Sequence, residues 1–311
     1  MEEEDKKQLH CSCFFGFGKR ASGVCFWAGF MLSYLQHDQE DKAMRITAHH
    51  AHLFPTQVRP AGDIAHLLST LDACGIEQCV AFAPFPVQMH RQDISPSRWL
   101  HDEIAPHGDR LFGFGVIDFA RGHLREQVDE IAQLGFRGIK LHPAYQHFHV
   151  FGPEAREVYA RAEELGLFLS FHTGVHFDRI AHYDVLLFDE IAWHYRKLRF
   201  SMEHIGGYSF VRPALAVLAN NDHDKEHPQV YGGFTSIFET ERNYLWYLSP
   251  EERALAVRMA GENGILFGLD FPYNDVAKIR QGIEAVLAMD VSETCKEKIL
   301  GGNLRGILGI D

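Results

Sequence analysis

The chain has 311 residues, 46% of them hydrophobic, which is enough to bury one large core or two modest ones. Its formal net charge of -12 argues against a surface that holds nucleic acid through massed cations. The six cysteines do not resemble the disulfide framework of a small secreted domain, so we expect a cytoplasmic protein.

Residues 1–43 differ from the rest of the chain. A charged start precedes an apolar stretch, residues 21–35, that is shorter than the ~20 residues a membrane-spanning helix needs. That start is mostly acidic, whereas a secretory signal begins with a basic region. We therefore expect residues 1–43 to be an N-terminal extension, disordered or outside the folded core, and we expect no membrane partner.

From residue 44 onward, apolar segments of strand length alternate with segments of helical periodicity. The expected strands are residues 45–47, 78–83, 111–117, 138–141, 167–171, 199–202, 230–237 and 265–269. The expected helices include residues 63–73, 124–134, 154–165, 250–260 and 276–287. Several of these helices are followed by glycine, as helix ends often are: Gly75, Gly135, Gly166 and Gly261.

Eight strands alternating with helices predict an α/β fold, a closed (β/α)8 TIM barrel, whose usual size is ~250 residues. We expect residues 44–311 to form this barrel as a single domain. An open doubly wound sheet is the alternative. Its glycine-rich nucleotide loop is missing, because Gly113 and Gly115 are not followed by a third glycine at the needed spacing.

Polar residues stand where the expected strands end. His50 and His52 follow the first strand and are two residues apart, so both rings can reach one ion. With 20 histidines in the chain, this pair alone is a weak signal. Similar positions after later strands hold Lys140, His142, His172, His204 and Asp270. Since barrel active sites form at the C-terminal ends of the strands, the set predicts one shared site.

Five motifs together resemble the amidohydrolase superfamily. They are His-Ala-His-Leu-Phe-Pro at 50–55, Gly-Ile-Lys-Leu-His-Pro at 138–143, Phe-His-Thr-Gly at 171–174, Glu-His-Ile-Gly-Gly at 203–207 and Gly-Leu-Asp-Phe-Pro at 268–272. The chain looks most similar to the amidohydrolase-related branch that includes aminocarboxymuconate semialdehyde decarboxylase. The resemblance covers roughly residues 44–310, and it implies a TIM barrel that holds a divalent metal.

The resemblance also implies roles for individual residues. The implied metal ligands are His50, His52, His172 and Asp270. This ligand set suits zinc and also manganese or iron. The ion would activate a water molecule, Asp270 would move its proton to the leaving group, and His204 would act on the substrate or position the water.

Two positions leave alternatives open. In binuclear relatives a carboxylated lysine after the fourth strand bridges two metals, so Lys140 and His204 form a possible second site. Alternatively, Lys140 is a buried cation balanced by a carboxylate, with His142 nearer the substrate; we favour one metal. Many relatives carry aspartate where this chain has Ala48, and strand alternation should turn His49 away from His50 and His52.

The loops after the strands are rich in aromatic residues and histidine, which suits a small planar or cyclic substrate. His142, Arg59 and Tyr145 are the expected substrate contacts, and Arg59 could hold a carboxylate. We expect a metal-dependent hydrolase that uses a metal-activated water on a small, cyclic or carboxylated substrate, at an amide, lactone or related bond. The alternatives are nonoxidative decarboxylation of an aromatic or unsaturated acid and a noncatalytic binding protein. A homodimer is possible, but no sequence feature shows one.

Overall fold

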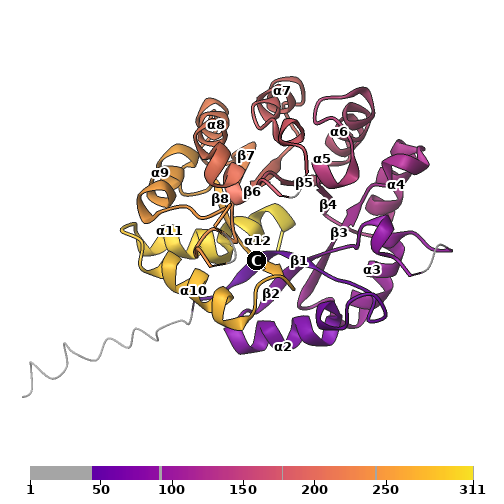
Figure 1. Ribbon diagram of the computed structural model, residues 1–311, viewed down its shortest axis with the longest axis horizontal. Coiled ribbons are helices and arrows are strands. Elements are labelled where there is room, and N and C mark those ends of the chain that lie inside the picture. Colours follow the sequence, from indigo (N-terminus) through magenta and orange to yellow (C-terminus); the bar gives the residue numbers. More distant parts are fainter. Residues whose placement is uncertain (1–43, 91–92, 177, 242–243, 311) are drawn as a thin grey trace, which may run out of the picture. The chain divides into compact units, whose positions relative to one another are not determined.

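The structure is a computed structural model that describes residues 44–90, 93–176, 178–241 and 244–310. The expected extension, residues 1–43, lies outside this range. Eight parallel strands pair in chain order, and β1 pairs with β8, so the sheet closes into a barrel (Figure 1). The strands are β1 (Thr47–His52), β2 (Gln78–Phe82), β3 (Leu111–Val116), β4 (Gly138–Leu141), β5 (Phe168–His172), β6 (Phe200–Glu203), β7 (Val230–Thr235) and β8 (Ile265–Phe271). The predicted TIM barrel is confirmed.

Helices surround the barrel, as Figure 1 shows. They are α2 (Ile64–Cys74), α3 (Pro96–Ile104), α4 (Leu124–Gln133), α5 (Pro143–Gln146), α6 (Pro153–Leu165), α7 (Leu187–His194), α8 (Gly207–Asn220), α9 (Pro250–Ala260), α10 (Val276–Leu287), α11 (Glu293–Glu297) and α12 (Asn303–Leu308). Side chains of Asp63, Ser95, Ser249 and Asp275 accept backbone N–H groups at helix starts, which satisfies donors that the first turn leaves free. No helix in the described ranges has the length and hydropathy needed to cross a bilayer.

The first strand is the one whose bounds differ most from the sequence prediction. Residues 45–47 were expected, but β1 begins at Thr47 and runs through the histidines to His52. All six of its residues are buried, including the polar ones. The histidine pair therefore lies inside a barrel strand and not in the loop behind it.

Aromatic and aliphatic side chains fill the part of the barrel interior that lies away from the C-terminal ends of the strands. Phe82, Phe114 and Phe168 pack there with Tyr231 and Leu266. Leu304, Ile307 and Leu308 of α12 belong to the same cluster, so this helix covers the end of the barrel opposite the C-terminal ends of the strands. A larger apolar cluster packs the helices against the outer face of the strands.

Gly268 of β8 makes room for the polar residues above this aromatic layer. A Cβ atom at this position would lie 2.1 Å from Thr235 Oγ1 and 3.0 Å from the Cβ of His50. Both neighbours are held by buried backbone, so neither can move away easily.

We predict that Gly268→Ala lowers the free energy of unfolding by about 1–3 kcal/mol, the usual cost of overpacking a core. Chemical denaturation of both proteins measures this. Gly306→Ala is the matched control, because a Cβ at Gly306 of α12 meets nothing within 4 Å. There alanine should be neutral or stabilise by up to about 1 kcal/mol. Equal stability of Gly268→Ala and the wild type would contradict the packing argument.

Candidate functional site

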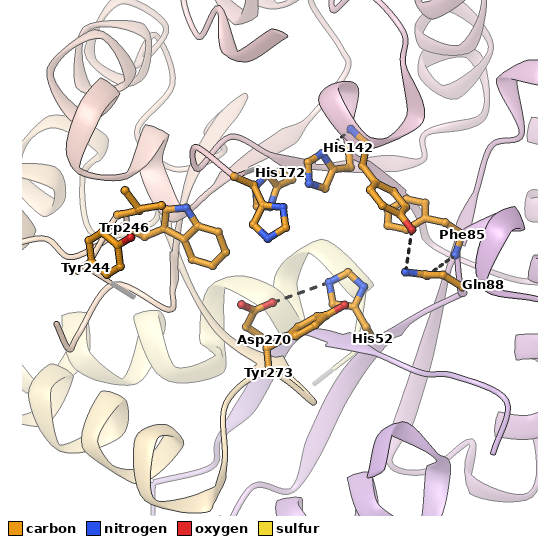
Figure 2. Close-up of a pocket in the computed structure, with 12 residues that line it drawn as sticks. His52, Phe85, Gln88, His142, His172, Tyr244, Trp246, Asp270 and Tyr273 are labelled. Carbon is orange, nitrogen blue, oxygen red and sulfur yellow. Dashed lines mark hydrogen bonds and ion pairs between the residues drawn. The ribbon is translucent and has the colours of Figure 1, made fainter. Parts of the chain in front are cut away.

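A cavity of about 320 Å³ opens at the C-terminal ends of the strands. Its wall is largely aromatic and histidine-rich (Figure 2). The lining residues are His52, Phe85, Gln88, His142, Tyr145, His172, His176, Tyr244, Leu245, Trp246, Asp270 and Tyr273. They come from loops or strand ends of β1, β2, β4, β5, β7 and β8, which is the arrangement expected of a barrel active site.

Three of the predicted metal ligands meet at this cavity. One ligand atom each from His50, His52 and Asp270 lies within 4.8 Å of the other two. Asp270 Oδ1 is 3.5 Å from His50 Nε2 and 3.9 Å from His52 Nε2. Two imidazole nitrogens and a carboxylate oxygen are ligands that zinc, manganese and iron accept. The residues present therefore fit a divalent ion.

His172, the fourth predicted ligand, lies in the cavity wall but outside that group. Its Nδ1 is 3.1 Å from His204 Nε2, and its Nε2 is 2.7 Å from the carbonyl oxygen of Gly174. His204 Nδ1 lies 2.7 Å from the carbonyl oxygen of Thr235, to which only an N–H can donate. These three contacts need three ring protons, whereas two neutral imidazoles carry two. Ligation by His172 stays a prediction.

The backbone of β1 brings more histidines inward than simple alternation allows. The pairing of β1 with β2 shifts between Ala48 and Ala51, and His50 has a positive φ of 67°. As a result His49 and His50 both lie inside the barrel and both contact Glu203. The prediction that His49 turns away from His50 is therefore wrong, and the cause is a bulge that adds a residue to the strand.

Strained backbone is concentrated around the site. Among the described residues, positive φ at non-glycine positions occurs at His50, His204, Ile205, Ser236 and Asp270, all at the ends of barrel strands, and at His123 and His147 elsewhere. Each such conformation costs on the order of 1–3 kcal/mol and persists only where surrounding contacts hold it. Ser236 shows one such contact, because its hydroxyl donates to Asp270 Oδ2 at 2.7 Å.

The titratable groups of the site are adapted to burial. Burial, together with nearby positive charge, holds the pKa values of His50, His52, His142 and His172 well below their usual range. Burial and the charge of Lys140 lower the pKa of His204 to about 3. These rings are neutral at physiological pH, which leaves each with a lone pair. Burial raises the pKa of Asp270 to about 6, although Ser236 and Lys140 act in the opposite direction.

Lys140 lies fully buried beneath the cavity, whereas His142 lines it. Lys140 Nζ is 3.3 Å from His50 Nε2 and 5.0 Å from the centre of the Phe82 ring. Burial lowers its pKa to about 8, against the attraction of Glu203 and Asp270. Among the described residues no carboxylate lies within 4.0 Å of Nζ, so the predicted buried cation has no direct ion pair here.

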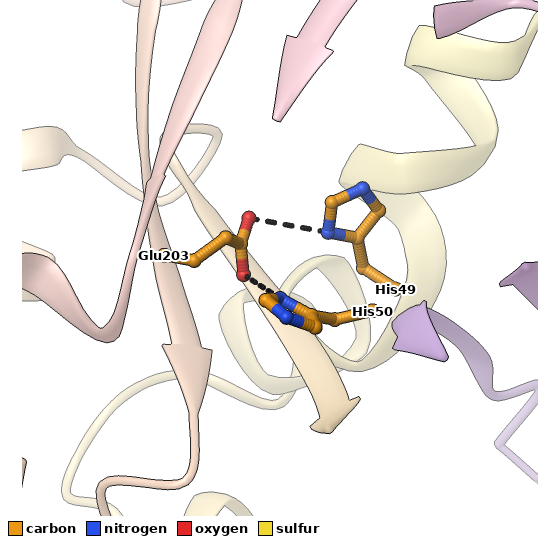
Figure 3. Close-up of side chains that lie close together, drawn as sticks. All are labelled: His49, His50 and Glu203. Carbon is orange, nitrogen blue, oxygen red and sulfur yellow. Dashed lines mark hydrogen bonds and ion pairs between the residues drawn. The ribbon is translucent and has the colours of Figure 1, made fainter. Parts of the chain in front are cut away.

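Glu203 is a site residue to which the sequence analysis gave no role. It ends β6, is fully buried, and points into the barrel between His49 and His50 (Figure 3). Burial by itself would raise the pKa of this carboxyl, but its contacts with both histidines outweigh burial and lower the pKa well below the usual range. The sequence feature that could have identified Glu203 is a charged residue at the end of a short strand, directly before His204.

Of the three predicted substrate contacts, two line the cavity and one does not. His142 stacks on His172 with ring centres 3.9 Å apart, and Tyr145 also lines the cavity. Arg59 is not a lining residue, because its guanidinium lies over the ring of Tyr273, 4.4 Å from the centre. Trp246, which the sequence analysis did not name, packs 4.2 Å from the His204 ring centre and donates from Nε1 to the carbonyl oxygen of Val175.

Comparison with known proteins identifies relatives. A family model described as amidohydrolase matches residues 48–310. A search of curated proteins finds no match.

Several solved structures share the fold. A 5-carboxyvanillate decarboxylase from Novosphingobium aromaticivorans with bound manganese has a TM-score of 0.66 and 15% identity, covering 86% of this chain and 98% of that one. A 2,6-dihydroxybenzoate decarboxylase from Rhizobium has a TM-score of 0.61 and 16% identity, with 86% and 99% covered. A candidate 2-pyrone-4,6-dicarboxylic acid hydrolase from Pseudomonas putida has a TM-score of 0.62 and 19% identity, with 86% and 98% covered. At these identities the likeness shows a shared fold.

Proposed function

The chain belongs to the amidohydrolase family, and from this premise we propose that it is a metal-dependent hydrolase of a small cyclic substrate. The bond cleaved would be an amide, a lactone or a related bond. The observation that carries the proposal is the meeting of His50, His52 and Asp270 at a cavity with a mostly aromatic wall. A binding protein would have no physical need for such a ligand group.

His50, His52 and Asp270 would hold the divalent ion, with His172 as the predicted fourth ligand. When bound, the ion supplies Lewis acidity to a substrate carbonyl and lowers the pKa of bound water to about 7. Zinc is our first choice for two or more imidazoles and a carboxylate, and manganese and iron fit the same set. Manganese is present in the Novosphingobium structure.

Asp270 is the proposed proton carrier. A buried carboxylate in the ligand group can accept a proton from the attacking water and release it to the leaving group. The Ser236 hydroxyl holds Oδ2, which leaves Oδ1 facing the two histidines. His204 would act on the substrate or position the water; its ring packs 4.2 Å from the ring centre of Trp246, which lines the cavity.

The wall of the cavity indicates the kind of substrate. Phe85, Tyr145, Trp246 and Tyr273 offer ring faces or edges to a flat molecule. No arginine or lysine is among the lining residues of the described chain. Within the described residues the wall thus offers no guanidinium or ammonium group to pair with several carboxylates, so we propose a neutral ring, such as a lactone or a cyclic amide.

Nonoxidative decarboxylation of an aromatic or unsaturated acid is the second candidate. It is favoured by the aromatic wall and by the decarboxylases among the structures of the same fold. Against it, the guanidinium of Arg59 lies on Tyr273, and no arginine or lysine of the described residues lines the cavity wall to hold a carboxylate.

A substrate panel tests the two candidates. The full chain, loaded in turn with zinc and with manganese, is incubated with lactones, cyclic amides and hydroxybenzoic acids, and products are identified by mass spectrometry. We expect hydrolysis of a neutral ring, seen as a gain of one water. Release of carbon dioxide from an acid would replace our first candidate with the second. Turnover of no substrate with either metal would favour a binding protein.

A further inference from the structure

Beneath the cavity, the carboxylate of Glu203 makes three hydrogen bonds and one further close contact with an imidazole. Ser201 Oγ donates to Oε1 at 2.5 Å, and Thr235 Oγ1 donates to Oε2 at 2.7 Å. His49 Nδ1 lies 3.1 Å from Oε1 and His50 Nδ1 lies 3.0 Å from Oε2. Each carboxylate oxygen thus faces one hydroxyl and one imidazole, which fixes the rotation of the carboxylate (Figure 3).

The barrel leaves space for this carboxylate. A Cβ atom at Gly233 of β7 would lie 2.3 Å from Glu203 Oε2, so only glycine fits there without displacing the side chain. A buried charge is costly unless it is paired and hydrogen-bonded. The chain satisfies that condition at Glu203 with four neighbours from β1, β6 and β7.

The contact with Glu203 determines which nitrogen of His50 carries the proton. An ionised carboxylate only accepts, so His50 Nδ1 must donate to Oε2. Nε2 of a neutral ring then bears the lone pair. The position of Lys140 matches this assignment of the lone pair to Nε2. Its charged Nζ can only donate, and it lies 3.3 Å from Nε2. Nε2 is also the atom that faces Asp270 Oδ1, at 3.5 Å.

We propose that Glu203 is a positioning residue for the metal site, which holds His50 with Nδ1 protonated and Nε2 directed at the ion. The proposal rests on the proposed metal-dependent function. A carboxylate behind a ligating imidazole fixes the ring and increases its basicity, and loss of such a partner typically costs 10- to 100-fold in metal affinity. The contact also helps to hold His50 in its strained backbone conformation.

Metal affinity of the full chain tests this proposal. We expect Glu203→Gln to raise the dissociation constant for zinc about 10- to 100-fold, measured by competition with a chelator. Ser201→Ala is the matched control. It removes a contact from the same carboxylate but on Oε1, so its affinity should stay within about threefold of the wild type, because the bond to His50 remains. An unchanged dissociation constant in a folded Glu203→Gln would overturn the proposal while leaving the proposed function intact.

A second measurement needs no variant of Glu203. In wild-type protein with nitrogen-15 histidine, long-range proton–nitrogen NMR spectra report the tautomer of each ring, and His50→Gln assigns the signal. We expect His50 protonated at Nδ1; protonation at Nε2 would overturn the proposal. A wild type that binds no zinc would instead refute the metal-dependent function on which the proposal rests.

Discussion

Asp270→Asn should lower kcat by about 10²- to 10⁴-fold, the range for loss of a general acid–base group. The amide keeps the size and one oxygen of the side chain but cannot carry the proton. KM should change much less than kcat, because the substitution removes proton transfer and keeps the shape of the side chain that lines the cavity. Steady-state kinetics on the substrate that the panel identifies, with metal content measured in parallel, provides the test.

Ser236→Ala is the matched control for Asp270. Its hydroxyl donates to Asp270 Oδ2, and Asn274 Nδ2 donates in turn to Ser236 Oγ. Ser236→Ala removes this hydroxyl but keeps the Asp270 carboxylate. The loss of kcat in Ser236→Ala should therefore be clearly smaller than the loss in Asp270→Asn. If Asp270→Asn keeps both its metal and its turnover, the assignment of Asp270 as proton carrier is wrong.

His52→Ala should weaken metal binding by more than the 10- to 100-fold that loss of an outer partner costs, because it removes a ligand. The ring lies at the cavity with Nε2 3.9 Å from Asp270 Oδ1, and no other described histidine belongs to this group except His50. Saturating zinc at 1,000 times its dissociation constant stabilises a protein by about 4 kcal/mol. Thermal unfolding with and without zinc should therefore show a large shift in wild type and little in the variant.

His142→Gln is the control for His52→Ala. His142 is also a buried histidine of the cavity wall, but it lies outside the ligand group and stacks on His172. This variant should keep the zinc-dependent shift in unfolding temperature and lose affinity for substrate. Equal loss of the shift in both variants would show that cavity packing, and not ligation by His52, accounts for the effect.

Much of the barrel could be predicted from sequence because its strands are buried on both faces and are followed by helices. Segments such as Gly138–Leu141 are short apolar runs with a glycine or a charged residue at the boundary. The first strand was placed too early because His49, His50 and His52 are polar, and hydrophobicity does not mark such residues as strand. α8 carries weak helix signals in the sequence, since it begins at Gly207, directly after Gly206, and contains Pro213.

The sequence predicts those site residues that stand at the ends of regular strands. It does not predict residues whose position depends on an irregular strand or on a loop. His50, His52 and Asp270 come together because all three stand at strand ends of one barrel. The inward turn of His49 follows from a bulge, which no periodicity reveals. Trp246 lies in the connection between β7 and α9, where neither strand nor helix periodicity indicates which side chain reaches the cavity.

Metal content of the full chain, purified without chelator and measured by inductively coupled plasma mass spectrometry, tests the central claim most directly. The ligand group of His50, His52 and Asp270 predicts about one equivalent of a divalent ion per chain, and close to none in His50→Ala. Two equivalents would contradict a single-ion site and bring Lys140 and His204 into the metal centre. No metal in the wild type, even after incubation with zinc or manganese, would contradict the account.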